Sequence, residues 1–476
     1  MGVERSLAQL SRRTMFGVAA ATMAGTTVVA CGTSDKSSST SVTLTPEDPK
    51  AIATDAYVFG YPLVLMDATR VAAEKITPAN TFQHAAALPT PGQRDIVRIN
   101  LDTLYSAAWL DVSTEPIVLQ VPAVEPGRYW LMQLMDAWTN TVHNPSSVRP
   151  QVKPDAPAPP YTYVVTGPQW TGSLPDGVTQ LSMPTPTVWL LGRIQVNGTD
   201  DIPAVQAIQR QLKLVPLKAW VEGKGAPASA TTPAAGSGTS PSKQVVEMDA
   251  ATFFERLCAV MKVNPPRAED LPAMNRFAAI GIRPGGSVTG ISADDLTAAA
   301  DKAKKQIPVY ADPNAVNENG WAFDPNIGAY GTDYWLRAST AWQGVGANLP
   351  EDAIYPTLFG SADLNGVPTN FRLHFPPGQL PPVDAFWSLT AYGADNFLIP
   401  NPANIFAIGH QVPVVLNADG SLDLAIQHTD PGARVPTGNW LPIPELGRFS
   451  LTMRLYAPRA VALDGQWKPP VLNVAP

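Results

Sequence analysis

The sequence predicts an α+β, β-rich fold with two β-sandwich-like domains of the jelly-roll type, helices near the N-terminus and a helical insertion between the domains. Two regions show short alternating runs typical of strands, and helical spacing dominates between them. The 49 prolines among 476 residues favour strands, turns and ordered loops over long helices. A chain of this length is also too long for one ordinary core.

Residues 1–30 have the pattern of a signal peptide. Arg12 and Arg13 precede a weakly apolar run that is too short for a stable membrane span, as in twin-arginine export signals. The alternative is an amphipathic surface helix, although no polar face continues beyond Arg13.

The segment "VVAC", which ends at Cys31, resembles the lipobox of bacterial lipoproteins. The resemblance implies lipidation of the thiol, with palmitate as an acyl group, and cleavage before Cys31. In the alternative, Cys31 is incidental to an ordinary cleaved signal. We expect a lipoprotein that is exported and anchored to the outer face of the cell membrane, with residues 31–45 as a flexible tether.

The rest of the chain divides into three predicted regions. Residues 46–200 hold an N-terminal helix and the first β-sandwich domain, and residues 311–476 form the second. Residues 201–310 form a helical connecting region, whose Gly-, Ser- and Pro-rich stretch at 222–243 is expected to be a disordered loop, because it has almost no apolar side chain to bury.

Two helical details carry specific expectations. In the N-terminal helix, Ile52, Ala56 and Phe59 share one face, and Pro62 is expected to break or kink the segment. In the connecting region, Cys258 lies at helical spacing among apolar residues behind an N-cap at Asp249, which favours a buried thiol over a nucleophile.

The densest polar signal is "RINLDTLY", in which Arg98, Asn100 and Asp102 alternate with apolar residues. As a strand, it would place Val97, Ile99 and Leu101 toward the core and these three side chains on the other face. An arginine, an amide and a carboxylate together can bind a polyhydroxylated or carboxylate-bearing ligand. A solvated outer face or a buried bracing network are the alternatives.

A second polar cluster follows the apolar run "WLMQLMD". Asp136, Thr139, Asn140 and His143 come at its end, where loops often place binding groups. A turn capped by Asp and Asn side chains is the alternative. The predicted ligand site is one cleft lined by six residues. They are Arg98, Asn100, Asp102, Tyr105, Asp136 and Asn140.

The usual catalytic signatures are missing from the sequence, including HExxH, GxSxG and the phosphate-binding loop. The 5 histidines lack ligand spacing, so we expect no metal and no cofactor. A net charge of −7 argues against nucleic acid as a partner. If the protein is an enzyme, Asp102 and Asp136 are the candidate catalytic carboxylates.

The second sandwich carries "NFRLHFP", with Phe371, Leu373 and Phe375 predicted inward and Arg372 and His374 outward. Trp387, Tyr392 and Trp440 follow in aromatic stretches near Asn and Asp residues. Such aromatics either stack on sugars or, more commonly, fill the core of a sandwich.

Two long blocks are similar to one family. They are "NLDTLYSAAWLDV" with "RYWLMQLMDAWTN", and "FWSLTAYGADNFLIPNPAN" with "NWLPIPELGRFSLTMRLYAP". They resemble exported bacterial proteins that combine the domain of unknown function 1254 with the domain of unknown function 1214. The resemblance implies two β-sandwich-like domains around a helical insertion, and it implies no catalytic residue.

Three functions remain open from the sequence. The first is an envelope lipoprotein that binds a saccharide or another polar envelope ligand. The second is a glycan-acting hydrolase with Asp102 and Asp136 as acid and base, which would need a suitable carboxylate separation. The third is a structural or protein-interaction module.

Overall fold

The computed structural model describes residues 47–94, 97–154, 156, 158–226, 230–232 and 239–475. The signal peptide, the tether, Arg12, Arg13 and Cys31 lie outside the described residues. The chain divides into two units, Met1–Asp48 and Pro49–Pro476, and the second is the one considered below. In the described ranges, no helix combines the length and the apolar character needed to cross a membrane.

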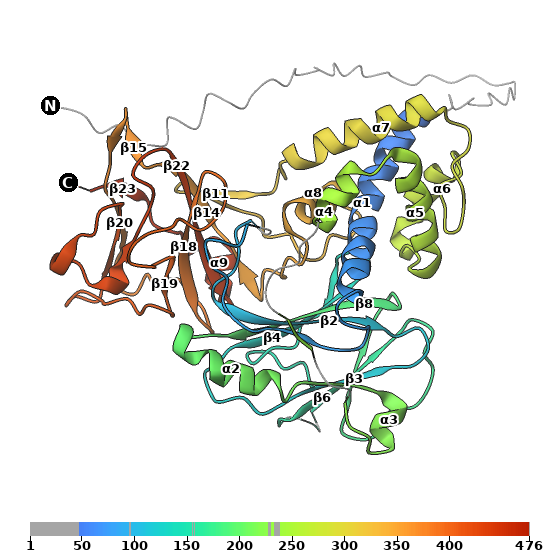
Figure 1. The fold of residues 1–476 in the computed structure, drawn as a ribbon, viewed down its shortest axis with the longest axis horizontal. Coiled ribbons are helices and arrows are strands. Elements are labelled where there is room, and N and C mark those ends of the chain that lie inside the picture. Colours follow the sequence, from blue (N-terminus) through green and yellow to red (C-terminus); the bar gives the residue numbers. More distant parts are fainter. Residues whose placement is uncertain are drawn as a thin grey trace, which may run out of the picture. The chain divides into compact units, whose positions relative to one another are not determined.

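The first sandwich packs a sheet of order β10-β1-β2-β8-β4-β5 against a sheet of order β7-β6-β3-β9 (Figure 1). Its strands are β1 (Gln83–Ala85), β2 (Thr103–Asp111), β3 (Ile117–Val121), β4 (Trp130–Asp136), β5 (Thr141–His143), β6 (Tyr161–Thr166), β7 (Thr179–Ser182), β8 (Thr187–Gln195), β9 (Lys213–Pro216) and β10 (Ala230–Thr232). The core between the sheets takes alternate residues of each strand, such as Leu104, Leu119 and Leu190.

The second sandwich packs a sheet of order β11-β12-β14-β22-β18-β19 against a sheet of order β21-β20-β17-β23. Its strands, with a small β15–β16 hairpin, are β11 (Val316–Glu318), β12 (Trp321–Phe323), β13 (Ala353–Ile354), β14 (Thr357–Ser361), β15 (Asp363–Leu364), β16 (Val367–Pro368), β17 (Phe371–Phe375), β18 (Trp387–Gly393), β19 (Ala407–Gly409), β20 (Leu422–Ile426), β21 (Trp440–Leu441), β22 (Arg448–Tyr456) and β23 (Leu472–Val474). On β17 the predicted alternation is confirmed, since Phe371, Leu373 and Phe375 are buried in the core.

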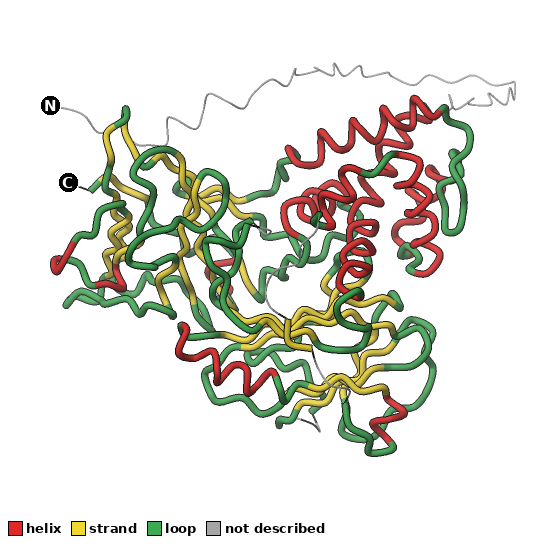
Figure 2. The backbone as a smooth tube through the Cα atoms, in the orientation of Figure 1, coloured by secondary structure: helices red, strands yellow, loops and turns green. Residues whose placement is uncertain are grey.

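The main helices gather around α1, apart from the sheets, whereas the short ones lie among the strands (Figure 2). The main ones are α1 (Pro49–Glu74), α4 (Pro241–Glu247), α5 (Ala250–Val263), α6 (Leu271–Ala278), α7 (Ala293–Gln306) and α8 (Tyr334–Gly344), and the short ones are α2 (Ile202–Gln209), α3 (Leu217–Val221) and α9 (Ala460–Leu463). The Asp249 cap on α5 is confirmed, because its Oδ1 accepts from the Thr252 amide at 2.9 Å. Cys258 is free and buried, as predicted.

The structure adds detail to the sequence expectations at three places in the helical regions. Pro62 lies inside an unbroken α1, because this helix is buried on nearly all sides by its helical neighbours instead of along one face. The connecting region predicted as helical at 201–310 contains the strand β9 between α2 and α3. Within 222–243, the described residues include β10, which pairs in parallel with β1, and the start of α4.

The two sandwiches with a helical layer confirm the predicted α+β, β-rich class. The sequence pattern did not reveal α8, which interrupts the strand-rich region after Trp321. Its helical neighbour is α1, so a helix from the C-terminal half completes the layer that begins at the N-terminus.

Candidate functional site

The outer face of the first sandwich's large sheet carries an arginine and a tyrosine as direct cross-strand partners. Tyr105 on β2 lies opposite Arg193 on β8, and the guanidinium carbon of Arg193 is 5.3 Å from the centre of the Tyr105 ring. Their neighbours Leu104 and Ile194 point the other way, into the sandwich core. Because side chains alternate along a strand, Tyr105 and Arg193 project away from that core.

The second sandwich presents a matching face on β22 and β18. Thr452, Arg454 and Tyr456 alternate along β22 with the core residues Met453 and Leu455. Arg454 Nη1 donates to Thr390 Oγ1 at 2.9 Å, and its Nη2 donates to the hydroxyl of Tyr392 at 2.6 Å. A charged residue in the middle of this apolar strand therefore has neutral partners on β18.

The two faces meet through the segment just before β2. Asn100 Nδ2 donates to the Tyr456 hydroxyl at 2.9 Å and to the Tyr105 hydroxyl at 3.3 Å. Asp102 Oδ2 accepts from Ser388 Oγ at 2.7 Å and from the Tyr456 hydroxyl at 3.1 Å. The contacts to Tyr456 and Ser388 join residues almost three hundred or more positions apart, so this region is a joint between the two sandwiches.

The expectation that residues 97–102 form a strand was wrong. Strand β2 starts only at Thr103, Arg98 has a φ of 51°, and Val97 is 43% exposed instead of facing the core. The Arg98 backbone is held in the left-handed region by contacts to the second sandwich, where its amide donates to the Asn396 carbonyl at 2.8 Å. Its guanidinium donates to Thr452 Oγ1 at 3.0 Å and Asn396 Oδ1 at 2.8 Å.

We call the cluster at this joint the tyrosine–arginine layer. It consists of Asn100, Tyr105, Arg193, Tyr355, Arg454 and Tyr456. Arg193 and Arg454 are each only 4% exposed, whereas Asn100, Tyr105 and Tyr355 keep part of their surface accessible. The accessible members are thus the ones that a ligand could contact first.

Tyr355 and Tyr456 of this layer are neutral and its arginines are charged. Burial raises the pKa of Tyr355 to about 12, although Arg193 lowers it. Burial alone would lower the pKa of Arg454, but Tyr392 and Asp102 raise it on balance. The layer therefore offers guanidinium donors, neutral hydroxyls and aromatic faces in one place.

Asp102 also faces His410 from the loop after β19. Its Oδ1 is 3.8 Å from His410 Nδ1, and neither atom has a hydrogen-bond partner among the described residues. His410 Nε2 lies 3.2 Å from the carbonyl oxygen of Val196, which fixes the ring's donor on that side. Burial lowers the pKa of His410, so the imidazole is neutral at pH 7.

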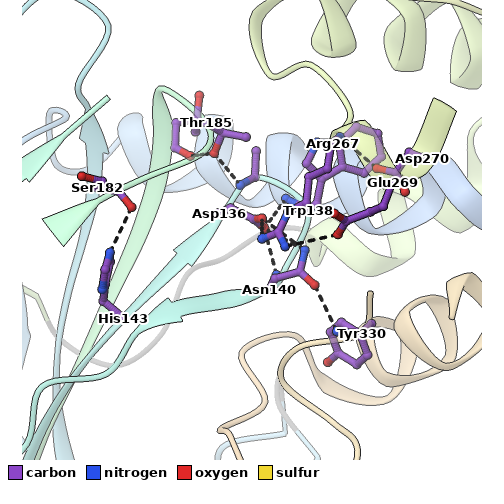
Figure 3. A network of polar contacts seen from close by, with 12 residues as sticks. Asp136, Trp138, Asn140, His143, Ser182, Thr185, Arg267, Glu269, Asp270 and Tyr330 are labelled. Atoms are coloured by element: carbon purple, nitrogen blue, oxygen red, sulfur yellow. Dashed lines mark hydrogen bonds and ion pairs between the residues drawn. The ribbon is translucent and has the colours of Figure 1, made fainter. Parts of the chain in front are cut away.

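Asp136 and Asn140 belong to a different cluster, which Figure 3 shows. Asp136 Oδ1 accepts from the Trp138 and Asn140 amides, both at 2.9 Å, and Oδ2 accepts from Arg267 Nη2 at 2.6 Å. The turn at 136–140 therefore wraps around its own carboxylate, with Thr139 at a φ of 70°. The capped turn that the sequence analysis kept as an alternative is the observed arrangement.

This cluster ties the first sandwich to the helical layer. The Asp270 carboxylate accepts from the Arg267 amide at 3.0 Å and from the Tyr334 hydroxyl at 2.9 Å. The guanidinium of Arg337 stacks on three aromatic rings beside it, with its carbon 5.1 Å from the centre of the Tyr334 ring. We call this cluster, made of Asp136, Asn140, Arg267, Asp270, Tyr334 and Arg337, the Asp136 network.

The six predicted site residues thus do not line one cleft. Arg98, Asn100, Asp102 and Tyr105 meet at the joint, whereas Asp136 and Asn140 lie in the Asp136 network. Asp102 and Asp136 are both 0% exposed, and they lie beside opposite ends of β8: Asp136 pairs with Val188, whereas the Asp102 carbonyl accepts from the Val196 amide. This arrangement gives the paired-carboxylate hypothesis no support, because a glycoside hydrolase needs both groups at the scissile bond.

A cavity of about 460 Å³ lies elsewhere, between α1, α5 and the ends of β2 and β8. Its charged lining residues already pair with each other or with nearby groups. Asp67 binds Arg70 and Arg256, both at 2.7 Å, and Arg70 also binds Glu74 at 2.7 Å. The cavity therefore has fewer open polar groups than the joint.

Other groups of the described chain add no second site. No set of three or more His, Cys, Asp or Glu side chains within the described ranges could hold a metal ion. Among the aromatics that the sequence left open, Tyr392 and Trp440 are buried, and the indole nitrogen of Trp440 donates to the Gln427 carbonyl at 2.9 Å. These two belong to the sandwich interior.

The sequence analysis missed Arg193, Tyr355, Arg454 and Tyr456. A signal for two of them is present in "RFSLTMRLY", where Ser450, Thr452, Arg454 and Tyr456 alternate with large apolar residues. A charged residue is rarely placed on a buried strand without a specific partner. The arginine in "TVWLLGRIQ" carries the same signal.

Comparison with known proteins assigns two domains. Residues 79–216 match the family described as "Protein of unknown function (DUF1254)", and residues 353–460 match the one described as "Protein of unknown function (DUF1214)". The DUF1254 match contains Asn100, Tyr105 and Arg193, and the DUF1214 match contains Arg454 and Tyr456. The tyrosine–arginine layer therefore lies where the two domains meet.

Two solved structures are similar to the chain. The VPA0106 protein from Vibrio parahaemolyticus is 23% identical, with a TM-score of 0.65 over 90% of this chain and 100% of that one. An uncharacterized protein from Burkholderia cenocepacia is 14% identical, with a TM-score of 0.42 over 90% of each chain. The first likeness shows the fold alone. No curated protein matches the chain significantly.

Proposed function

The chain belongs to the proteins that combine a DUF1254 domain with a DUF1214 domain, and from the geometry of their joint we propose that it is a ligand-binding protein of the bacterial cell envelope. Its ligand is a saccharide or another polar envelope component. The binding site is the tyrosine–arginine layer. The proposal starts from two facts: the DUF1254 domain precedes the DUF1214 domain in the chain, and the tyrosine–arginine layer lies where these two domains meet.

One observation carries the binding proposal. Tyr105 and Tyr355 keep accessible surface directly beside Arg193, whose guanidinium is buried and has no hydrogen-bond partner for Nε among the described residues. A saccharide needs an aromatic face for its C–H groups and fixed donors or acceptors for its hydroxyls. Tyr105, Tyr355 and Asn100 supply these features at one place.

Ligand-induced stabilisation tests the binding proposal. The purified full chain is screened by thermal unfolding against neutral and acidic monosaccharides and against envelope extract. We expect at least one ligand to raise the melting temperature, since a ligand that binds only the folded state stabilises it. Tyr355→Ala, which removes one of the two partly accessible tyrosines beside Arg193, should abolish that rise.

A matched control is available in the helical layer. Tyr310 also keeps accessible surface and stacks on Trp335 of α8, with ring centres 5.9 Å apart, so Tyr310→Ala removes a tyrosine ring away from the tyrosine–arginine layer. We expect this variant to keep the ligand response. No response of the wild-type chain to any probe, or an equal loss in both variants, would overturn the proposed site.

The proposal places the protein at the outer face of the cell membrane through a lipid on Cys31. The lipobox-like "VVAC" and the paired arginines before it support this location. Cys31→Ala should lose acyl-lipid labelling and membrane retention, whereas Cys258→Ala, which removes the buried thiol, should keep both. Labelling that persists in Cys31→Ala would refute the anchor.

The export route has its own test. Replacing Arg12 and Arg13 by lysine should block export, because the twin-arginine transporter recognises paired guanidinium groups. Arg12 and Arg13 precede the apolar run of the first thirty residues, so they are the paired arginines that match a twin-arginine signal. Normal export of the double variant would assign the general secretory route instead.

A further inference from the structure

The joint between the two domains holds more buried positive charge than negative charge. Arg193, Arg454 and Asp102 all lie close enough to Tyr355 to affect its pKa, and Arg98 lies beside Arg454, to which its carbonyl is hydrogen-bonded. Three guanidinium groups against one carboxylate leave an excess of two positive charges. Buried charges are normally paired, because transferring an unpaired ion out of water is costly.

The contacts of Arg193 and Arg454 show that no carboxylate offsets this excess of positive charge. In the described part of the chain, neither guanidinium has a carboxylate oxygen within 4.0 Å. Arg193 donates to Gln133 Oε1 at 2.5 Å and to the Gly346 carbonyl at 3.0 Å. Arg454 donates to Thr390, to Tyr392 and to the Arg98 carbonyl, the last at 3.1 Å.

Neighbouring groups do not neutralise this charge. Asp352, another buried carboxylate near the joint, is paired with Arg149 at 2.6 Å. Burial keeps the pKa of Tyr456 well above its usual value, so this hydroxyl stays neutral. Arg98 and Arg454 repel each other, which, after burial, contributes to lowering the pKa of Arg98.

We propose that the ligand of the tyrosine–arginine layer carries an oxyanion, which is either a carboxylate or a phosphate. The guanidinium groups of Arg193 and Arg454 attract this oxyanion, and Arg193 binds it directly. This inference rests on the proposed binding function and narrows it to acidic ligands. Guanidinium groups match oxyanions in shape and donate to them in pairs. The unpartnered Nε of Arg193 is a donor already positioned for such a contact.

The accessible tyrosines define how the ligand would lie. Tyr105 is the cross-strand partner of Arg193, and Tyr355 lies close enough for Arg193 to affect its pKa. A sugar ring stacked on these two side chains would hold its acidic substituent near Arg193. The neutral part of the ligand thus contacts the accessible surface, and the anion contacts the buried charge.

The experiment compares three probes that share a hexose ring: glucose, glucuronic acid and glucose 6-phosphate. Affinity for the purified full chain is measured by calorimetry at two salt concentrations. We expect one acidic probe to bind at least tenfold more tightly than glucose, with an affinity that falls as salt rises. The better of the two acidic probes identifies the oxyanion as carboxylate or phosphate.

Arg454→Met and Arg193→Met should each remove the preference for the acidic probe. Arg372→Met removes the same charge from the outward face of β17, and we expect it to retain the preference. Circular dichroism and the melting temperature verify that each variant is folded. If Arg193→Met does not fold, Arg193→Lys, which keeps the charge but loses the paired donors, takes its place and should weaken acidic binding.

The outcomes separate this inference from the proposed function. Equal binding of glucose and both acidic probes would overturn the oxyanion and leave saccharide binding standing. Binding of inorganic phosphate as tightly as glucose 6-phosphate would support the oxyanion and count against the sugar. A preference that survives in Arg193→Met and Arg454→Met, or is lost equally in Arg372→Met, would overturn the assignment to this layer.

Discussion

The tyrosine–arginine layer and the Asp136 network are both buried polar clusters between domains, but they differ in charge balance. In the Asp136 network, Arg267 and Arg337 face two buried carboxylates, Asp136 and Asp270, and Arg267 also pairs with the exposed Glu269 at 3.6 Å, so no positive charge is left over. At the joint, three guanidinium groups face one carboxylate. A cluster whose charges are balanced within the chain needs no further counter-charge, whereas a cluster with excess positive charge can bind an anionic ligand.

The two clusters also differ in accessible surface. Asp136, Asn140 and Asp270 are all buried, and the hydrogen bonds that they make come from the surrounding backbone and side chains. Asn100, Tyr105 and Tyr355 at the joint remain partly accessible. The comparison suggests that the Asp136 network is scaffold and that the joint is the binding region.

The largest expected effect is on the Asp136 network. Arg267→Met leaves the fully buried carboxylate of Asp136 without its ion-pair partner, and it should lower the free energy of unfolding by about 3 kcal/mol or more. Urea denaturation of the variant against wild type measures the difference. A loss below about 1 kcal/mol would show that the amide donors of the turn suffice, and the comparison with the joint would fail.

An intermediate effect is expected at Asp102. The Asp102→Asn variant keeps an acceptor for Ser388 and Tyr456 but removes the single carboxylate of the joint. We expect a loss of about 1–3 kcal/mol in unfolding free energy, because hydrogen bonds to a charged group become neutral and the excess positive charge grows. An unchanged melting temperature with abolished ligand response would instead make Asp102 a ligand contact.

Protonation of His410 should contribute a pH dependence to the joint. Burial lowers its pKa in the folded chain, whereas in the unfolded chain it titrates near 6.5. As the pH falls below 6.5, the unfolded chain binds a proton that the folded chain resists, so stability decreases. His410→Gln can still donate to the Val196 carbonyl and should lose part of this decrease, which unfolding curves between pH 7 and 5 will measure.

These residues show how much the sequence could predict. Alternation and proline content predicted the sandwiches, because each strand buries one face locally. The polar stretch from Arg98 to Tyr105 was recognised, but its partners come from β8, β18 and β22. Local periodicity contains no information about which outer faces meet, so the sequence analysis grouped Asp102 with Asp136 although the fold separates them.

The same limit explains the two carboxylates. Asp102 lies two positions after Asn100 and Asp136 lies four positions before Asn140, each in an apolar context, so the sequence gives no reason to treat them differently. Only the fold reveals their partners. Arg267, from the helical layer, forms an ion pair with Asp136. Arg454, from the second sandwich, lies near Asp102 but forms no ion pair with it. Arginines within apolar strands are the sequence signal that would have directed attention to the joint earlier.

The smallest expected effect on stability tests the comparison most directly, because it repeats the first substitution in the other cluster. Arg454→Met removes a buried guanidinium that has no carboxylate partner within 4.0 Å in the described chain. The loss of its hydrogen bonds to Thr390 and Tyr392 is offset by relief of the repulsion with Arg98 and of the desolvation of the charge. We expect the free energy of unfolding to change by less than about 1 kcal/mol, against about 3 kcal/mol for Arg267→Met. If Arg454→Met costs as much as Arg267→Met, the charge at the joint is already compensated within the chain, and both clusters are scaffold.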